Sequence, residues 1–579
     1  MKTRQWLAVV GVGALTTLTV AGWGTSPLAK TSSATASGKI IVMALEPLVA
    51  PNWFFPVFSS TAYTVTNLQA TALMYKPLLD ITKTDAIDYN RSLVSKIQVN
   101  KADTEFTLTM NSKYHWSNGK PVSAQDVVFN WDIIKATSQP GAPWGYGGAG
   151  IGGVPGDWKS VVALNPHTVV ITTTKPVNPV WFIHNGIGQL EPVPASVWDK
   201  YPKNMARELR FIESVANSPT NPVYRIVDGP YNFYKYEADN YWEWAPNPHY
   251  GGKRSTISRF MLKYETSTVS EFAQLRAGTI NVGYLSNSLW TSRQELPNDT
   301  LDVSYLFGFS SFYLNQNPKA PGGLGPVFAQ QYVREALQMG VNQPGIIRGI
   351  YHGNGVVSYG PVSSKPDSIF YDPALSKPAY PYNPAKGKRL LESHGWHEVN
   401  GVMTRGKVQL KFTVDYISGS QSTTDMMSYI QAGWAKEGIK VTLQAEPLDT
   451  VVALGNQSDP TKWNMAGPMD WTYEPDYYPS GGGLFATGAG SNGGGYSSSQ
   501  ANAIIAKIYQ PGTSQQTLKN LFAYEEYIHQ SNPVLFMPWL AGSYQAIGFL
   551  LVHANNVHGT YQTFNPISDL LYPNYWTVQ

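Results

Sequence analysis

Acid–base chemistry could use paired carboxylates such as Glu474 and Asp476. Two carboxylates can serve as general acid and general base when both face one substrate. Residues two apart do not share a helix face, and on a strand this pair would share a face only beside proline and tyrosines. Pro475 favours an extended chain, so we expect both acids to point toward the surface. Catalysis by this pair is therefore an alternative to the hypothesis developed below.

Metal and cofactor chemistry has two candidate motifs. His394 and His397 could bind a metal, but Gly395 ends a predicted helix there and no carboxylate–histidine set lies nearby, so we expect a solvated turn. Gly148–Gly153 spells G-x-G-x-x-G without the strand and helix that a dinucleotide site requires. His-Glu-x-x-His, Walker and Gly-x-Ser-x-Gly motifs are absent. The sequence predicts no cofactor, no metal and no catalytic residue.

The composition narrows the class of protein. The 579 residues are 42% hydrophobic, which supports real cores and two to four domains. The chain has 42 basic and 39 acidic residues, a balance that argues against nucleic-acid binding. It has no cysteine, which excludes disulfides and thiol catalysis.

The N-terminal segment has the order of a secretory signal peptide. A basic start and the apolar run Trp6–Val20 precede a small-x-small cleavage site at Ala34–Ala36. We place the signal peptide at residues 1–36; the alternative is an uncleaved N-terminal anchor. Trp23 stands where a bacterial lipoprotein box needs cysteine, so cysteine-linked lipid is excluded. We expect a secreted protein of the extracellular or cell-envelope (periplasmic-type) space.

Hydrophobic periodicity predicts alternating strands and helices along the mature chain. Helix-then-strand units are typical of α/β domains. Capping residues mark two of the helix starts, Ser123 with Asp126 and Asn383 with Pro384. The predicted strands are residues 39–45, 105–110, 167–172 and 439–443. Predicted helices begin near residues 123, 383 and 499, and apolar residues at helical spacing mark two more, within 333–341 and 427–434.

One segment carries a recognisable signature. Phe106–Trp131 reads as a strand, a Trp-Ser-Asn-Gly turn, a proline and a capped helix that begins Asp-Val-Val. It resembles the signature of bacterial extracellular solute-binding proteins of family 5, which serve oligopeptide-type ABC importers. The resemblance continues in the family's order over residues 40–579. Its further segments are Asp228–Tyr231, Asn247–Gly252, Phe272–Val282, Phe312–Asn315, Val333–Leu337, Gly353–Val356 and Gly387–Trp396.

The resemblance implies an α/β fold of the periplasmic-binding-protein-like type II. Two large lobes with a hinged cleft are accompanied by an additional small lobe. By analogy, lobe I comprises residues 38–78, 191–300 and 532–579, lobe II residues 79–190, and lobe III residues 301–531. The ligand would lie between lobes I and III, which would close around it.

The resemblance also implies where a ligand binds. Strand edges at Ala44–Pro51, which includes Glu46, and at Met465–Pro475 would pair with an extended peptide. The family's amine-binding acid lies in an Asp-Tyr-x-Glu/Asp-Pro segment, and Trp471 occupies its position here. Asp470 lies one residue away, and such a shift changes the face of a strand unless a bulge absorbs it. We expect Asp470, between two apolar neighbours, to be the poorly hydrated anchor for a ligand ammonium.

Aromatic residues gather around the implied cleft. They could stack on sugar rings or peptide side chains, and for any one of them simple packing is the alternative. The candidates are Trp53, Trp144, Tyr146, Trp471 and Tyr473.

The function that the resemblance implies is non-catalytic. A monomeric secreted protein would capture oligopeptides or dipeptides and deliver them to the membrane permease subunits of an ABC transporter. An oligosaccharide ligand is the main alternative, because the acid is displaced. Two less favoured functions are a secreted hydrolase and a peptide-binding chaperone or signalling receptor on the same scaffold.

Overall fold

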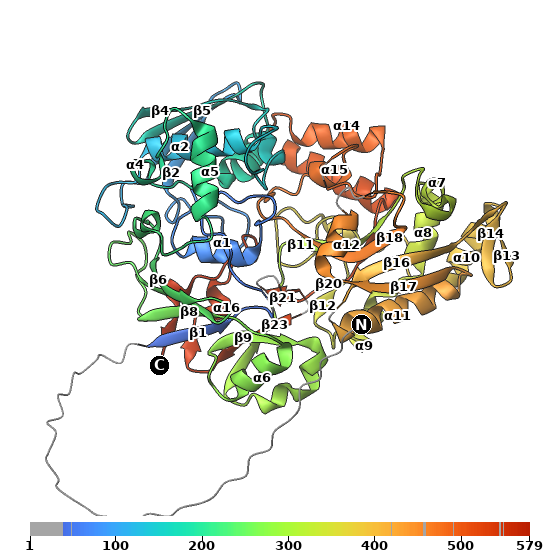
Figure 1. Cartoon of the computed structure of the whole chain (residues 1–579). Coiled ribbons are helices and arrows are strands. Elements are labelled where there is room, and N and C mark those ends of the chain that lie inside the picture. Colours follow the sequence, from blue (N-terminus) through green and yellow to red (C-terminus); the bar gives the residue numbers. More distant parts are fainter. Residues whose placement is uncertain are drawn as a thin grey trace, which may run out of the picture. The chain divides into compact units, whose positions relative to one another are not determined.

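The computed structural model describes residues 39–579 except 48, 419, 456–458, 490, 544–545 and 548 (Figure 1). The predicted signal peptide and Trp23 lie outside the described residues. Among the residues that are described, no helix is both long and apolar enough to cross a membrane.

A seven-stranded sheet gathers three distant parts of the chain (Figure 1). The first predicted strand forms as β1 (Ile40–Ala44), which pairs in parallel with β8 (Arg259–Lys263). Near the C-terminus, β23 (Phe549–Ala554) pairs with β9 (Val282–Ser286) and β10 (Asp299–Asp302). The sheet is completed by β6 (Tyr231–Glu237) and β7 (Tyr241–Pro246), in the order β10-β23-β9-β1-β8-β7-β6.

A four-stranded antiparallel sheet contains the signature segment. Its order is β2-β3-β5-β4, with β2 at Val94–Val99, β3 at Glu105–Met110, β5 at Thr168–Thr173 and β4 at Trp158–Asn165. Helix α2 (Ala124–Thr137) begins where the capping pair predicts. The Asp126 carboxylate accepts hydrogen bonds from the Ser123 backbone N–H at 2.8 Å and the Trp116 indole N–H at 3.2 Å. Asp126 thus joins the turn that contains Trp116 to the start of α2 by hydrogen bonds.

A five-stranded sheet occupies the second half of the chain, in the order β17-β16-β18-β11-β19. Helix α10 begins at the predicted cap, since the Asn383 side chain accepts from Lys386 N–H. The segment that forms β19 pairs with β11 in this sheet, although the analogy placed it in lobe I. The strands are β11 (Gly308–Leu314), β16 (Lys411–Ile417), β17 (Lys440–Glu446), β18 (Met465–Thr472) and β19 (Leu535–Met537).

Besides α2, further α-helices of seven or more residues flank these sheets. They are α1 (Val65–Ala72), α5 (Met205–Val215), α6 (Thr268–Arg276), α8 (Gln331–Met339), α9 (Gln343–Gly349), α10 (Pro384–Ser393), α11 (Gln421–Ala435), α12 (Leu448–Gly455), α14 (Ser499–Ile508) and α15 (Ser514–Ser531). Two small sheets are made of short strands. In one, β12 (Gly355–Val356) pairs with β20 (Trp539–Leu540). The other contains β13 (His397–Val399), β14 (Val402–Arg405) and β15 (Val408–Gln409).

The hydrophobic core is continuous across much of the chain. The largest cluster of buried apolar side chains takes members from the seven- and four-stranded sheets and from α14 and α15. A second cluster lies in the five-stranded sheet and its helices, around Phe312, Leu337 and Trp434. The chain passes between the two larger sheets twice, from β10 to β11 and from β19 to β23. The lobe boundaries themselves remain predictions.

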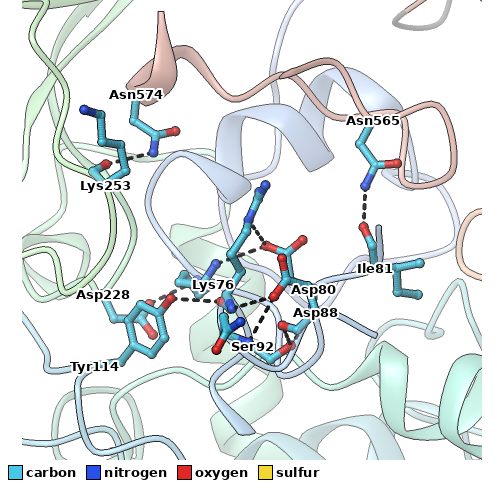
Figure 2. Close-up of polar contacts among 12 residues, drawn as sticks. Lys76, Asp80, Ile81, Asp88, Ser92, Tyr114, Asp228, Lys253, Asn565 and Asn574 are labelled. Carbon is cyan, nitrogen blue, oxygen red and sulfur yellow. Dashed lines mark hydrogen bonds and ion pairs between the residues drawn. The ribbon is translucent and has the colours of Figure 1, made fainter. Parts of the chain in front are cut away.

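Polar contacts join separate segments of the chain to one another (Figure 2). The Asp80 carboxylate forms ion pairs with Lys76 at 3.4 Å and Arg91 at 3.2 Å. The Lys76 backbone N–H donates to Asp228 at 3.1 Å. Close to the C-terminus, Asn574 donates to the Lys253 carbonyl at 2.9 Å, so the end of the chain is held against its middle.

Candidate functional site

The site implied by the sequence is built around β18. This strand pairs with β11 from Met465 to Thr472, but with β16 only at Met465 and Ala466. Gly467 and Pro468 lie in a bulge of the β11 pairing, so within the described residues it is Met469–Thr472 that has a strand partner on one edge and none on the other. An edge of this kind presents backbone N–H and C=O groups that another extended chain can pair with.

Asp470 lies opposite Ser310 in the β11–β18 register. Its side chain is exposed, yet the protein around it raises the pKa of the carboxyl to about 6 by desolvation, while a hydrogen bond from Ser310 opposes the shift. Burial raises the pKa of the Tyr351 phenol, and the Asp470 charge adds to that shift. Asp470 is thus reachable by solvent and incompletely hydrated.

The two apolar neighbours of Asp470 pack into the protein. Met469 joins a small cluster with Val451 and Trp463. The Trp471 ring packs, partly buried, against the main core, and its indole N–H is buried without a hydrogen-bond partner in the part of the chain that is described. Both neighbours thus have packing roles, and Asp470 is the most exposed of the three side chains.

The acids beside Pro475 do not point toward the surface, so this expectation was wrong. Asp476 is buried and accepts a hydrogen bond from the Asn185 amide. Glu474 is partly buried, and its Oε1 accepts hydrogen bonds from the Tyr63 hydroxyl at 3.0 Å and the Tyr477 hydroxyl at 3.2 Å. Proline fixes only the local chain direction; the segments that contain Tyr63 and Asn185 cover these acids.

Tyr63 and Asn185 come from segments far from β18 in sequence. Tyr63 precedes α1, and Asn185 lies in a π-helical turn, Phe182–Gly186. Asn185 also donates to the Tyr478 carbonyl at 2.9 Å and accepts from the Tyr478 N–H at 2.6 Å. The chain just after β18 is therefore held from two sides.

A second glutamate lies near Glu474. Burial raises the pKa of Glu191 to about 8, and the negative charges of Glu474 and Asp228 add to the shift, while Lys76 opposes it. Burial raises the pKa of Glu474 to about 7, against the two tyrosine hydrogen bonds. Among the described residues, neither glutamate forms an ion pair with lysine, arginine or histidine.

The predicted aromatic residues differ in their surroundings. Trp53 and Trp144 are buried against each other, edge to face, with ring centroids 5.4 Å apart. Their indole N–H groups donate to backbone carbonyls at 3.1 and 3.0 Å. Tyr473 is fully buried, and its hydroxyl donates to the Pro361 carbonyl at 2.6 Å. These three side chains thus have packing partners and satisfied polar groups.

Tyr146 and Glu46 complete the predicted set. The Tyr146 hydroxyl donates to Gln189 at 2.9 Å, and burial together with the charges of Glu191 and Glu474 raises the pKa of this tyrosine, so it adjoins the glutamate pair. Glu46 follows β1, and burial raises the pKa of its carboxyl to about 7. No hydrogen bond or ion pair connects Glu46 to Asp470 in the described parts of the chain. Ligand contact by the predicted residues stays a prediction.

The histidine pair and the glycine-rich segment noted in the sequence are the remaining motifs. His394 stacks on Tyr332, with ring centroids 3.8 Å apart. The glycine-rich segment ends in a short turn, Ile151–Gly153, instead of the N-terminus of a helix. In the described residues, no group of three or more histidine or acidic side chains could hold a metal ion.

Comparisons with known proteins identify the fold and the family. The AppA oligopeptide-binding protein of Bacillus subtilis, solved with a nonapeptide, superposes with a TM-score of 0.74 over 94% of this chain and 99% of that one at 19% identity. A periplasmic EDTA-binding protein, EppA, gives 0.76 over 93% and 96% at 14% identity. The fold is therefore that of a type II periplasmic binding protein, mixed α/β with several sheets.

The sequence comparisons lead to the same class. The model of bacterial extracellular solute-binding proteins, family 5 Middle, matches residues 88–490. AppA of Bacillus subtilis (strain 168) is 24% identical over 405 residues, 69% of each chain. The chain belongs to the bacterial extracellular solute-binding proteins of family 5.

Three residues near Glu474 and Asp476 could not be found from the sequence as part of the candidate site. Tyr63, Asn185 and Glu191 carry no motif and stand hundreds of residues from β18. Only the folded contacts bring them to Glu474 and its neighbours.

Proposed function

We propose that this protein captures peptides between its lobes and delivers them to the membrane permease of an ABC importer. Membership of family 5 supports capture and delivery as the class of function. The relative AppA is an oligopeptide-binding protein, which supports peptide as the ligand. A secreted, monomeric protein without cysteine-linked lipid belongs to the same proposal.

The observation that carries peptide binding is the unpaired edge of Met469–Thr472. An extended peptide presents the backbone donors and acceptors that such an edge lacks. Pairing along the edge gives affinity that does not depend on the peptide's side chains. Asp470 on the same stretch would bind the peptide ammonium by a charge-assisted hydrogen bond.

The surroundings of the other acids support binding without turnover. Glu474 accepts hydrogen bonds from two tyrosines and Asp476 from Asn185, so both are engaged within the protein. A general acid or base must instead reach a substrate proton. Sustained product release from peptide or glycan libraries would contradict a binding role.

A neutral oligosaccharide is the second candidate. Trp471 occupies the position where the family's acid stands, and a tryptophan ring suits a sugar face better than an ammonium. The displaced acid is the specific observation in its favour.

Native mass spectrometry of protein purified from its own host, with the ligand retained, tests the proposal. Adduct masses that fragment into amino acids are the expected result. Calorimetry with the identified peptide and with a neutral sugar then separates the two candidates. A retained hexose series, with no binding of any peptide, would replace peptide by oligosaccharide.

A further inference from the structure

Asparagine followed by glycine is the pair of residues most prone to lose ammonia without an enzyme. The backbone nitrogen of the second residue attacks the asparagine amide carbon, and glycine, which has no side chain, hinders this attack least. The pair occurs five times in the chain, each time among residues that the structure describes. The five are Asn118–Gly119, Asn185–Gly186, Asn354–Gly355, Asn400–Gly401 and Asn492–Gly493.

Three of the five asparagines are buried, and their amides are hydrogen-bonded. Asn185 and Asn492 each form three hydrogen bonds through the side-chain amide. The Asn354 amide forms one, and the N–H of the next residue, Gly355, donates to the Gly353 carbonyl at 2.9 Å. At these three places the reacting groups are held apart and water is largely excluded.

Asn118 is exposed, but the turn that contains it is closed by two hydrogen bonds. Its Oδ1 accepts from the Lys120 N–H at 3.1 Å. The attacking group, the Gly119 N–H, donates to the Trp116 carbonyl at 2.8 Å. Each hydrogen bond that must open before the reaction slows it by about 2- to 12-fold.

Asn400 and Gly401 form the open tip of the hairpin between β13 and β14. Val399 pairs with Val402, so the loop has two residues. Their φ angles of +51° and +78° lie in the left-handed region, for which Asn-Gly is favoured in such loops. Both residues are exposed, and among the described residues neither the Asn400 amide nor the Gly401 N–H has a hydrogen-bond partner. A Cβ built on Gly401 would meet no atom within 4 Å, so a ring has room to form there.

We propose that Asn400 is a site of spontaneous deamidation, the first of the five pairs to react in the folded protein. The Gly401 nitrogen loses its proton to solvent base and bonds to Asn400 Cγ. The Cγ–Nδ2 bond then breaks, and ammonia leaves with a proton from water. Water opens the resulting five-membered imide at either carbonyl carbon, which yields aspartate or isoaspartate. The net reaction consumes one water and releases one ammonia, and it needs no enzyme.

Either product changes the hairpin. A new carboxylate at position 400 adds negative charge near Glu398, whose side chain forms an ion pair with Lys388 at 2.6 Å. Isoaspartate also carries the backbone through the former side chain, which lengthens a two-residue loop by one atom. The pairing of Val399 with Val402 should therefore weaken, because the loop sets the register of a hairpin. The modified form accumulates with the age of the molecule.

Peptide mapping by mass spectrometry tests the proposal. The full chain is incubated at pH 8 and at pH 5 in water enriched in oxygen-18, which labels only the carboxyl groups formed during the incubation. The Asn400 peptide should gain label first, and faster at pH 8, because the deprotonated nitrogen attacks. The Asn118 peptide, a matched exposed control with two hydrogen bonds to open, should react at least about fivefold more slowly. Asn400→Asp supplies the chromatographic standard for the aspartate product, so the isoaspartate peak can be recognised.

Concentrated urea is the control for the fold. In urea the hydrogen bonds of the turns are lost, so the five pairs should react at similar rates. Asn400 that gains label no faster than Asn118 in the folded protein would overturn the inference. The same order of rates in urea would overturn it too, because the cause would then be the local sequence and not the folded surroundings. No ligand enters the experiment, so its outcome is independent of the proposed function.

Discussion

Replacement of Asp470 by asparagine removes one negative charge from the unpaired edge of β18 and nearly preserves the shape of the side chain. Asp470 is exposed, and its side chain contacts Ser310 across the β11–β18 ladder. Asparagine can keep a hydrogen bond to Ser310, so we expect the variant to fold with the stability of the parent protein. The substitution should therefore lower the affinity for the ligand without lowering the stability of the protein.

The magnitude follows from the partial hydration of this carboxylate. A fully buried charge pair that loses one partner costs about 2–5 kcal/mol. Water reaches Asp470, so screening reduces the expected loss to the lower limit of that range or slightly below it, about 1.4–2 kcal/mol, or about 10- to 30-fold in Kd. The carboxyl pKa of about 6 adds a pH dependence. Below pH 6 the free protein holds Asp470 protonated, so affinity for an ammonium ligand should fall as the pH falls.

Calorimetry with a peptide found by native mass spectrometry, and with the same peptide N-acetylated, provides the assay. The free amine should bind Asp470→Asn at least tenfold more weakly than the parent protein, and the acetylated peptide should bind both equally. Equal affinity of the free amine for both proteins would refute the anchor. An equal loss of affinity for both peptides would show that Asp470 maintains the strand edge and does not bind the ammonium group.

Four further predictions concern the fold, the pH response, the N-terminus and closure. Gly152→Ala places a Cβ 2.2 Å from the Asn185 carbonyl oxygen at φ +59°, so urea unfolding should show a loss of about 2 kcal/mol or more, whereas Gly156→Ala, in open space, should be nearly neutral. Both Glu437 carboxyl oxygens are buried and have no hydrogen-bond partner among the described residues, and burial raises the pKa of this carboxyl to about 9. The folded state therefore holds a proton that the unfolded state releases, so stability falls as the pH rises from about 4.5 to 9. Glu437→Gln should flatten that slope and stabilise the protein at pH 7 by up to about 3 kcal/mol. Intact mass of the native N-terminus should show no diacylglycerol, because Trp23 replaces cysteine; any such adduct contradicts this. Small-angle scattering should give a smaller radius of gyration with saturating ligand, and an identical profile would count against a closing trap.

Local signals in the sequence predicted the elements well. The capping pairs at Ser123 and Asn383 mark the starts of α2 and α10, because a cap depends on residues within one turn. The strand at 105–110 forms with the expected bounds. The order of motifs along the chain predicted the family and hence the type II fold.

The site could be predicted only in part. The edge of β18 followed from the resemblance, but the orientation of Glu474 and Asp476 did not follow from Pro475. Local chain direction says nothing about which distant segment covers a side chain. Tyr63 and Asn185 determine those surroundings, and both contacts span more than 290 residues of sequence.

The strand order of the seven-stranded sheet limits how far this sheet can form while the chain is still being synthesised. Strand β23 lies between β9 and β10 and is itself formed by residues 549–554 of 579. Until those residues leave the ribosome, β10 has no strand beside it and β9 lacks the partner on one side. Pairings of such long sequence separation also form slowly. A nascent or C-terminally truncated chain therefore presents open strand edges, and a chaperone or export factor that binds extended segments would find them available throughout synthesis.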